Sequence, residues 1–600
     1  MYYASLAAGG TAFAASLAGY ALLYRKRLAL PMCFFPAVCF SGMAVAVYLF
    51  GLLDLLGPGC LIAAAGGWAA LILCRDRDWR ALADPSLLLF VFGTVWLFVI
   101  TRGVMPSHWD DLTHWFRICA VMDADGTLPT APDIRFYTYV PGTAVWIHLV
   151  TRFTGFNEAN CYFAQGLLDL AGVVCLFAPF ARAEDRKLRL LGLLPVGLGG
   201  ILLCSMDVST YVLLVDTVLA LMPMAALLLA LDGEEDRSVL FSGCLLLCFT
   251  ALIKNSGLFL AAATWILACL RRRFPLRRWL ASAALWAALP ALLHRLYGLR
   301  AARYYADGAL QDPQAMDSGR YLRILGEKSP QSLAKLRGDF LRAVTDTGGE
   351  PAVRAVWLWL AVFLVLALLA LALGRREEGA RVLRHWAAGL CLAAAWCGGL
   401  LATYVFSMSV EEADRLACFY RYFGTIAIYL VGAGTYLLLR AAVDGGGRTV
   451  LSVLASVLLI VYTQSSFSTG YLWGYAHYEP VEPYSTDIWA AFRRCVPPDR
   501  QYTETSYLIM WDADEFARNT PALFRNTATI YLRSTHVRGI PIQDFAGGVS
   551  EEELRKLSDY DYLVTLSDIP ETVRDLYPYL GIREEDYHLG ICPIPGPPDE

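Results

Sequence analysis

The sequence predicts a polytopic α-helical membrane protein that carries a small α/β domain at its C-terminal end. Composition is the first observation: of 600 residues, 57% are apolar and 17% are charged, against about 25% charged in soluble proteins. The second is a mean hydropathy of +0.47. The third is that apolar runs of spanning length recur up to residue 465, where the composition changes. Together these properties exclude a soluble enzyme, a disordered chain and a coiled coil.

We predict about fourteen membrane spans, since a helix needs about 20 apolar residues to cross a bilayer. They are residues 4–24, 28–50, 59–74, 84–101, 159–181, 188–204, 211–231, 238–253, 257–270, 279–297, 352–374, 386–406, 421–440 and 449–464. Several runs are short, so one or two are expected to be tilted or re-entrant. The first run lacks a positively charged flank and a clear cleavage site, so we interpret it as a retained helix rather than a signal peptide.

The placement of lysine and arginine predicts the orientation, because cytoplasmic loops are enriched in both. Loops 51–58 and 205–210 hold neither, and the acidic loop 232–237 breaks the pattern. We therefore expect a multi-pass protein of the cell membrane, with both termini, the loops 102–158 and 298–351, and the tail outside the cytoplasm. The basic residues of the loops expected inside are Arg25, Lys26, Arg27, Arg75, Arg77, Arg80, Arg182, Arg186, Lys187, Arg189, Arg271, Arg272, Arg273, Arg277, Arg278, Arg375, Arg376, Arg381 and Arg384.

The tail is a different kind of sequence, with 21 acidic and 11 basic side chains in residues 481–600. Tyr507–Trp511 and Tyr562–Leu566 are β-branched or aromatic runs that favour strands. Ser550–Glu553 is a capping box that opens a helix through Leu557. The predicted organisation is therefore N-terminal transmembrane helices (1–84), a transmembrane catalytic module with interface helices in loop 102–158 (85–465), and an extracytoplasmic α/β domain (480–600).

Cysteine usage gives no sign of a metal or disulfide scaffold. Most of the 16 cysteines lie inside apolar runs, where cysteine behaves as a small buried hydrophobe. No cysteine pair has metal-ligand spacing with histidines nearby, so a zinc site is not expected. Cys495 and Cys592 are the only cysteines of the tail, and the sequence is consistent with either a disulfide or two unpaired thiols. Nucleic acid is not an expected partner, because no basic stripe exists outside the short loops.

The densest polar group of the chain follows the fourth predicted span, at Ser107–Arg117. If this segment is helical, Asp110, His114 and Arg117 share one face. The pattern predicts a helix that lies in the membrane interface, with its carboxylates at the boundary between water and lipid. Alternatively, Asp110 and Asp111 only cap the helix, where acids interact favourably with its dipole. The apolar stripe on another face, at helical spacing, is Trp109, Leu112, Phe116 and Cys119.

Two short motifs resemble a known superfamily. Residues 109–115, Trp-Asp-Asp-Leu-Thr-His-Trp, are similar to the acidic first-loop motif of protein O-mannosyltransferases and lipid A aminoarabinose transferases. Residues 139–143, Tyr-Val-Pro-Gly-Thr, resemble the Tyr-Pro-Pro-Gly-Thr of many bacterial members and lead into a second amphipathic stretch, 144–153. Over about residues 85–465 the chain thus resembles the GT-C superfamily of membrane glycosyltransferases. It departs from the pattern at Val140, which replaces the first proline, and in having three spans before the motif instead of one.

Further charged residues lie in or next to other loops that are expected outside the cytoplasm. Asp216 lies inside an apolar span, where a carboxylate is costly. It is therefore either functional, or it pairs with a neighbouring helix or snorkels to the interface. Lys254 lies in a predicted external turn, and its alternative interpretation is a solvated lysine. Arg415 and Arg421 lie in a short charged loop, where arginine is suited to grip a phosphate with two hydrogen bonds. The neighbouring acids suggest an internal salt-bridge cluster instead, and they are Glu411, Glu412 and Asp414. Weaker candidates for binding the phosphate are Arg303, Arg320 and Arg323.

The resemblance implies transfer of a sugar from a polyprenyl-phosphate-linked donor to a glycan, lipid or protein acceptor of the cell envelope, with inversion expected. It implies Asp110 as the base that deprotonates the acceptor hydroxyl, with Asp111 positioning the acceptor or acting as the base instead. Basic residues would stabilise the departing lipid phosphate. Some members need a divalent metal and others do not, and the sequence does not decide between them. The residues expected to bind substrate are His114, Tyr139, Asp216, Lys254, Arg415 and Arg421.

Three other classes of protein are alternatives to this prediction. A transporter or flippase of lipid-linked sugars would place its functional charges near the bilayer midplane and show inverted repeats. The sequence shows no such repeat, and its candidate charges lie at the outer ends of the spans. A polysaccharide polymerase or ligase would also use external arginines but needs no acid pair. A scaffold that only anchors the tail would explain neither Asp216 nor the acid pair.

Overall fold

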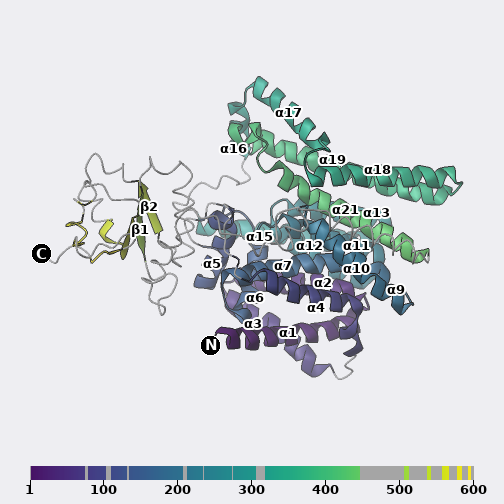
Figure 1. Ribbon diagram of the computed structural model, residues 1–600, viewed down its shortest axis with the longest axis horizontal. Coiled ribbons are helices and arrows are strands. Elements are labelled where there is room, and N and C mark those ends of the chain that lie inside the picture. The colour runs from purple at the N-terminus through teal and green to yellow at the C-terminus, as the bar shows by residue number, and fades with distance from the viewer. Residues whose placement is uncertain are drawn as a thin grey trace. The chain divides into compact units, whose positions relative to one another are not determined.

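The structure is a computed structural model of the chain (Figure 1). It describes residues 2–74, 79–102, 104, 108, 110–130, 134, 136–206, 212–233, 236–272, 275–305, 318–445, 506–511, 537–541, 557–565, 574, 577–583 and 592–595. The chain forms two compact units. The first comprises Met1–Val104 and Phe136–His477, and the second comprises Met105–Arg135 and Tyr478–Glu600. The predicted boundary near residue 84 stays a prediction.

The first unit is a bundle of helices. Eight helices in the described ranges are long and apolar enough to cross a membrane, and two further apolar helices are shorter. Every predicted span up to residue 440 contains a helix, and the predicted span 449–464 lies outside the described residues. The prediction of a polytopic helical membrane protein is confirmed. The helices are α1 (Tyr2–Leu28), α2 (Phe35–Gly51), α3 (Leu56–Leu73), α4 (Pro85–Ile100), α6 (Gly142–Thr154), α7 (Glu158–Val174), α8 (Ala178–Ala181), α9 (Arg186–Leu191), α10 (Leu193–Cys204), α11 (Asp216–Asp232), α12 (Asp236–Ile253), α13 (Gly257–Arg272), α14 (Leu276–Ala283), α15 (Leu289–Tyr304), α16 (Ser318–Glu327), α17 (Pro330–Thr345), α18 (Pro351–Ala372), α19 (Arg376–Phe406), α20 (Val410–Asp414) and α21 (Phe419–Asp444).

Helices α1 and α3 pack closely because small residues face each other along their contact. A Cβ atom added to Gly19 would lie 1.9 Å from the backbone oxygen of Gly67. Beside this contact, the Ser16 hydroxyl donates a hydrogen bond to the Ala64 carbonyl oxygen at 2.8 Å. In a membrane the burial of apolar side chains gives little net driving force between helices, so close backbone approach and interhelical hydrogen bonds hold such pairs together.

We expect Gly19→Ala to destabilise this helix pair, because the added methyl group would meet backbone that has no rotamer to change. Overpacking of this kind costs about 1–3 kcal/mol. The measurement is the thermal unfolding temperature of the purified protein in detergent. Gly10→Ala on the same helix is the matched control, since an added Cβ there meets nothing within 4 Å. Equal unfolding temperatures for the two variants would contradict the close α1–α3 packing.

Helix α11 lies in the core of the bundle, against α7, α12, α13 and α21 (Figure 1). All of its residues from Asp216 to Ala230 are buried. Such an outcome is expected of a helix that is apolar on all sides. The helix has 17 residues, which corresponds to a length of about 25 Å. A carboxylate stands at each end of it, Asp216 at the first residue and Asp232 at the last, and both ends are therefore places where charge is held inside the protein.

The second unit contains helix α5 (Phe116–Asp125) and a four-stranded sheet. Strand β1 (Tyr507–Trp511) is parallel to β2 (Val537–Pro541) and to β3 (Tyr562–Thr565), and β4 (Cys592–Pro593) is antiparallel to β3. The two predicted strands are confirmed as β1 and β3, and the strand order β2-β1-β3-β4 places them next to each other. The predicted helix from Ser550 lies almost entirely outside the described residues. The buried residues around the sheet include Leu508, Met510, Leu557, Leu563, Tyr577 and Leu580.

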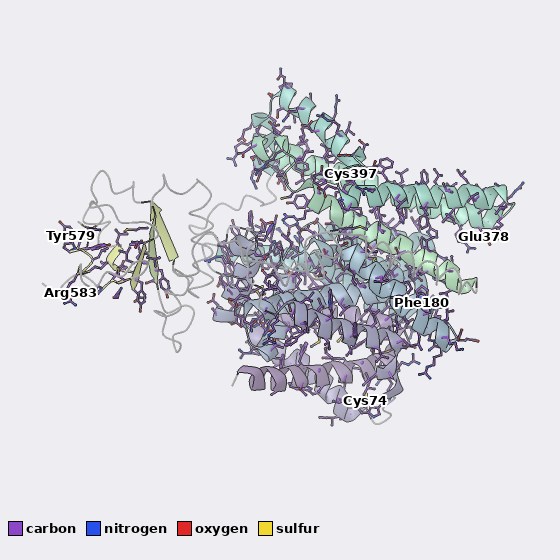
Figure 2. The ribbon with its side chains drawn as sticks, viewed as in Figure 1. Cys74, Phe180, Glu378, Cys397, Tyr579 and Arg583 are labelled. Atoms are coloured by element: carbon purple, nitrogen blue, oxygen red, sulfur yellow. The ribbon has the colours of Figure 1, made fainter. Side chains whose placement is uncertain are left out.

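The described cysteines are all free thiols. Cys74, which follows α3, and Cys397 on α19 lie on well-separated helices (Figure 2). Cys592 is buried in the core around the sheet. Cys495 lies outside the described residues, so the two alternatives for Cys495 and Cys592 both stay open. Figure 2 also shows side chains of the second unit, with Tyr579 and Arg583 labelled.

Candidate functional site

Three of the predicted substrate-binding residues meet at the N-terminal end of α11. Lys254 Nζ lies 2.9 Å from Asp216 Oδ1, and Arg421 Nε lies 3.5 Å from Asp216 Oδ2. Their side chains are 2% (Asp216), 11% (Lys254) and 16% (Arg421) exposed. The interpretation of Lys254 as a solvated lysine is therefore wrong, and the pairing of Asp216 with neighbouring helices is observed. Because these groups have lost most of their hydration, the interactions among them are strong and the group is costly to leave unbalanced.

Two glycines fix the position of Lys254, which directly follows α12. The chain turns there and enters α13 at Gly257, where an added Cβ would lie 2.0 Å from the Thr250 carbonyl oxygen. On the other side of the turn, an added Cβ on Gly142 would lie 2.4 Å from the Leu252 carbonyl oxygen. The glycine of the Tyr-Val-Pro-Gly-Thr motif thus allows the start of α6 to pack directly against the end of α12.

Arg421 lies in the first turn of α21, after a loop with unusual backbone angles. Leu416 and Cys418 have φ values of 48° and 59°, in the left-handed region that residues other than glycine avoid. Such conformations cost about 1–3 kcal/mol each and persist only where surrounding contacts hold them. One such contact involves Ala417, the residue between them, whose carbonyl oxygen accepts a hydrogen bond from the Tyr404 hydroxyl at 2.8 Å. The end of α19 thereby helps to set the direction from which Arg421 approaches Asp216.

A cavity of ≈ 720 Å³ lies beside this group of charges. Asp216 and Lys254 form its charged lining, and Tyr139 of the sequence motif lines it as well. Much of the remaining lining is apolar and comes from α13, α16 and α19, including Phe259, Leu322, Trp396, Leu400 and Phe406. The cavity therefore offers a ligand both a few convergent charged groups and a long apolar wall.

Two residues that sequence reasoning missed support the basic groups. The ring of Tyr422 lies 4.7 Å from Lys254 Nζ and 5.0 Å from Arg421 Cζ, and cation–π contacts of this kind are strengthened by loss of water. His294 Nε2 lies 3.0 Å from Asn255 Oδ1 in the turn that follows Lys254. Neither contact has a sequence signature, although Tyr422 directly follows Arg421 and could have been included as its neighbour.

The wall that α16 contributes to the cavity is tied to the end of α19. Lys328, just after α16, donates through Nζ to the carbonyl oxygens of Val405 at 3.0 Å and Met408 at 2.7 Å. Burial lowers the pKa of this ammonium group below its ordinary value. Because lysine carries three donors and the end of a helix leaves carbonyl groups unpaired, this one side chain fixes α16 relative to α19.

The other basic candidates do not join the group. Arg415 is 64% exposed and contacts Glu411 at 3.9 Å, and Arg303 and Arg323 are also exposed. The acids of the same loop have structural partners, as the alternative interpretation expected. Glu412 forms a capping box with Ser409, and Asp414 contacts Ser332 and Lys335.

The acid pair Asp110–Asp111 belongs to the second unit. Both backbone N–H groups donate to His108, that of Asp110 to Nδ1 at 3.1 Å and that of Asp111 to the carbonyl oxygen at 3.0 Å. Asp111 opens a π-helical turn that runs to Trp115, a local geometry that is frequent at functional sites. The Asp110 side chain makes no capping hydrogen bond to this turn.

The segment around the acid pair is helical, as predicted, but it does not have the predicted two faces. His114 and Arg117 are 2% and 3% exposed, which is as buried as Phe116 and Cys119 of the apolar stripe. The stretch 144–153 is likewise helical and buried on nearly all sides. Periodicity predicted the helices correctly, but it did not predict that protein would cover their polar faces. Within the described residues, no three His, Cys, Asp or Glu side chains lie together as metal ligands would.

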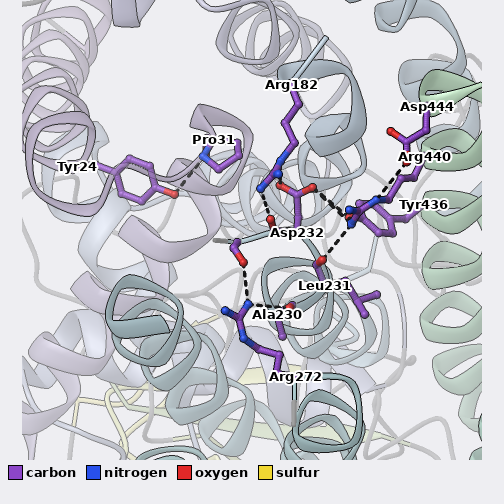
Figure 3. A network of polar contacts seen from close by, with 11 residues as sticks. Tyr24, Pro31, Arg182, Ala230, Leu231, Asp232, Arg272, Tyr436, Arg440 and Asp444 are labelled. Atoms are coloured by element: carbon purple, nitrogen blue, oxygen red, sulfur yellow. Dashed lines mark hydrogen bonds and ion pairs between the residues drawn. The ribbon is translucent and has the colours of Figure 1, made fainter. Parts of the chain in front are cut away.

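The opposite end of α11 carries a second charged group (Figure 3). Arg182 Nε lies 3.1 Å from Asp232 Oδ2, the Tyr436 hydroxyl donates to Asp232 Oδ1 at 3.2 Å, and Arg440 Nη1 lies 4.0 Å from Oδ1. Arg272 donates to the carbonyl oxygens of residues 230 and 233 at 3.0 Å and 2.7 Å. An acid at the C-terminal end of a helix opposes the helix dipole, so the three arginines compensate both the carboxylate and the free carbonyl groups. We therefore interpret the charged group around Asp232 as structural.

Comparison with protein-family models and with curated protein sequences gives no match. Among solved structures, the chain is similar to the crystal structure of ArnT from Cupriavidus metallidurans bound to undecaprenyl phosphate. The sequence identity is 14% and the TM-score is 0.38. The match covers 82% of this chain and 94% of that chain.

Proposed function

We propose that the chain transfers a sugar from a polyprenyl-phosphate-linked donor to an acceptor hydroxyl at the outer face of the cytoplasmic membrane. One observation carries the proposal: Asp216 and Lys254 line a largely apolar cavity of ≈ 720 Å³ in a multi-pass membrane protein, and Arg421, whose side chain is only 16% exposed, faces the same carboxylate as Lys254. A lipid-linked phosphate is a ligand that uses both features, because its chain needs an apolar wall and its phosphate needs charged donors.

The two basic residues have complementary roles in this proposal. The ammonium of Lys254 acts as a compact point charge, whereas the planar guanidinium of Arg421 can donate two parallel hydrogen bonds to one phosphate. Negative charge grows on the phosphate as its bond to the sugar breaks, so donors held in place before the reaction stabilise the transition state more than the ground state. Arg415 is not part of the proposed site, because it is exposed and paired with Glu411.

Asp110 is proposed as the general base, with Asp111 positioning the acceptor. The Asp110 carboxylate takes the proton of the acceptor hydroxyl while the hydroxyl oxygen forms a bond to the anomeric carbon. The bond from that carbon to the phosphate oxygen breaks, and its electron pair leaves on the lipid phosphate. A single displacement of this kind inverts the anomeric centre. His114 and Tyr139 are proposed to contact the substrates, and Tyr139 lines the cavity.

The location of the charges favours this proposal over transport of lipid-linked sugars. Asp216 is the first residue of α11, and Lys254 follows the last residue of α12. Both therefore lie at helix ends that the sequence predicts to be external, whereas a transporter would place its coupling charges near the bilayer midplane.

The proposal is tested by binding and transfer assays with Lys254→Met and Arg421→Met. We expect each variant to bind polyprenyl phosphate at least tenfold more weakly, since a hydrogen bond to a charged group contributes about 1.5–3 kcal/mol. Binding of the uncharged polyprenol should not change. Transfer from a purified polyprenyl-phosphate sugar should lose more in turnover than in the apparent constant for the donor. Lys254→Arg should rescue only partly.

Arg415→Met is the matched control for these variants. It removes an arginine of the same loop whose side chain is 64% exposed, so binding and turnover should match those of the unmodified protein. If both Lys254→Met and Arg421→Met show the binding and turnover of the unmodified protein, the phosphate does not bind in this cavity and the proposal is overturned.

A further inference from the structure

We infer that Asp216 is an internal counter-ion of the phosphate site, which the phosphate of the bound lipid displaces and which then opposes retention of the more highly charged product. The inference rests on the proposed function and specifies the role of this carboxylate within it. It assigns Asp216 to the release of the lipid phosphate rather than to the chemistry at the sugar.

The geometry of the pair suggests this role. The two oxygens of Asp216 face two different cations, Oδ1 towards Lys254 at 2.9 Å and Oδ2 towards Arg421 at 3.5 Å. Two oxygens of a phosphate group present a similar pattern of acceptors to a lysine and an arginine. The carboxylate therefore occupies the positions that the proposed ligand needs, and the two compete for the same donors.

The cost of two buried cations explains why a counter-ion is needed when the site is empty. Lys254 and Arg421 have lost most of their water, and buried charges without a partner are strongly destabilising. Asp216 reduces the charge of the group from +2 to +1. It is also the first residue of α11, where the helix dipole favours an anion. The carboxylate therefore keeps a favourable environment after a ligand has taken over its cations.

The sugar-linked donor and the lipid phosphate product differ in the charge that they bring to this site. A sugar linked through a phosphodiester carries one negative charge, which makes the total of the three side chains and the ligand zero. Transfer breaks the bond between the sugar and the phosphate and leaves a phosphate monoester, whose charge near pH 7 is about −1.5 to −2. The extra charge faces Asp216, and like charges in a site of low dielectric constant repel strongly. The product is thus held less tightly than it would be by two cations alone.

The first test measures the affinity of Asp216→Asn for polyprenyl phosphate and for uncharged polyprenol in detergent. We expect polyprenyl phosphate to bind about tenfold more tightly than to the unmodified protein, which corresponds to about 1.4 kcal/mol, and polyprenol to bind equally. Asp216→Glu keeps the charge and should reverse most of the gain in affinity that Asp216→Asn shows. Asp414→Asn is the matched control, because it removes a carboxylate that contacts Ser332 and Lys335 instead.

The second test compares the unmodified protein with a folded variant that lacks the carboxylate, and Asp216→Ser takes the place of Asp216→Asn if the latter does not fold. The affinity of each protein is measured from pH 5.5 to 8 for polyprenyl phosphate and for its methyl ester, which stays a monoanion. The second proton of the monoester leaves near pH 6. The dianion meets two cations and a carboxylate in the unmodified protein but two cations alone in the variant. We therefore expect the affinity of the monoester, relative to that of the methyl ester, to rise less with pH in the unmodified protein than in the variant. The titratable groups that line the cavity are Tyr139, Asp216, Lys254, Tyr321 and Tyr422, and Arg421 contacts Asp216 from behind this lining. Both ligands meet these groups alike.

The outcomes separate this inference from the proposed function. Weaker or unchanged binding of polyprenyl phosphate by a folded Asp216→Asn would overturn the counter-ion role, as would a relative affinity for the monoester that changes equally with pH in the unmodified protein and in the variant without the carboxylate. If the unmodified protein shows no preference for polyprenyl phosphate over polyprenol, the proposed function fails and the inference fails with it.

Discussion

Asp110→Asn should reduce sugar transfer by roughly 10²-fold or more, because the amide keeps the size of the side chain and cannot accept the proton of the acceptor. Protein abundance should hardly change, since Asp110 is only half buried and asparagine retains a hydrogen-bonding oxygen. The measurement is turnover with a purified polyprenyl-phosphate sugar, alongside the amount of folded protein. Binding of the lipid phosphate should be nearly unaffected.

Asp111→Asn is the informative comparison for this prediction. Asp111 is fully buried, so its replacement tests whether the second acid acts in the chemistry or in holding the π-helical turn. Loss of transfer in Asp111→Asn with normal transfer in Asp110→Asn would mean that the two roles are exchanged. Normal transfer in both variants would remove the base from this segment, and the proposed enzyme would lose its catalytic assignment.

Asp232→Ala should strongly destabilise the protein without acting on the proposed site. The change leaves Arg182 and Arg440 facing each other at the end of α11 without their shared carboxylate (Figure 3). Breaking a buried pair by removing one partner costs about 3–5 kcal/mol, and we expect the lower end of this range because both arginines are about one third exposed. The measurements are the yield of folded protein and its thermal unfolding temperature in detergent.

The matched control is Asp444→Ala. Asp444 also contacts Arg440, at 3.7 Å, but it is 70% exposed, and exposed ion pairs contribute about 0–1 kcal/mol. Its removal should therefore leave the unfolding temperature nearly unchanged. A stability of Asp232→Ala equal to that of the control would show that the arginines at this end of the bundle do not depend on the buried carboxylate.

The sequence by itself determined the membrane fold and where its helices lie. The length of an apolar run is a local property of the sequence, and a run long enough to cross the bilayer is expected to span it. It forms a helix because a backbone in lipid must satisfy its own hydrogen bonds. Every predicted span up to residue 440 accordingly contains a helix. The strands at Tyr507 and Tyr562 were also predictable, since β-branched and aromatic residues favour extended chain. Charge in an apolar span marked Asp216 for the same local reason.

Only the tertiary structure decided which of the marked residues lie together. Asp216 meets Lys254 and Arg421 because α11, α12 and α21 end near one another, and helix packing over more than 200 residues of sequence leaves no periodic signal. Arg415 and Arg421 were equivalent in the sequence, yet one faces solvent and the other faces Asp216. The first turn of α21 sets that difference. His114 and Arg117 are buried in the structure, although the sequence pattern predicted that they face water. Burial depends on what packs against a helix, which its own residues do not specify.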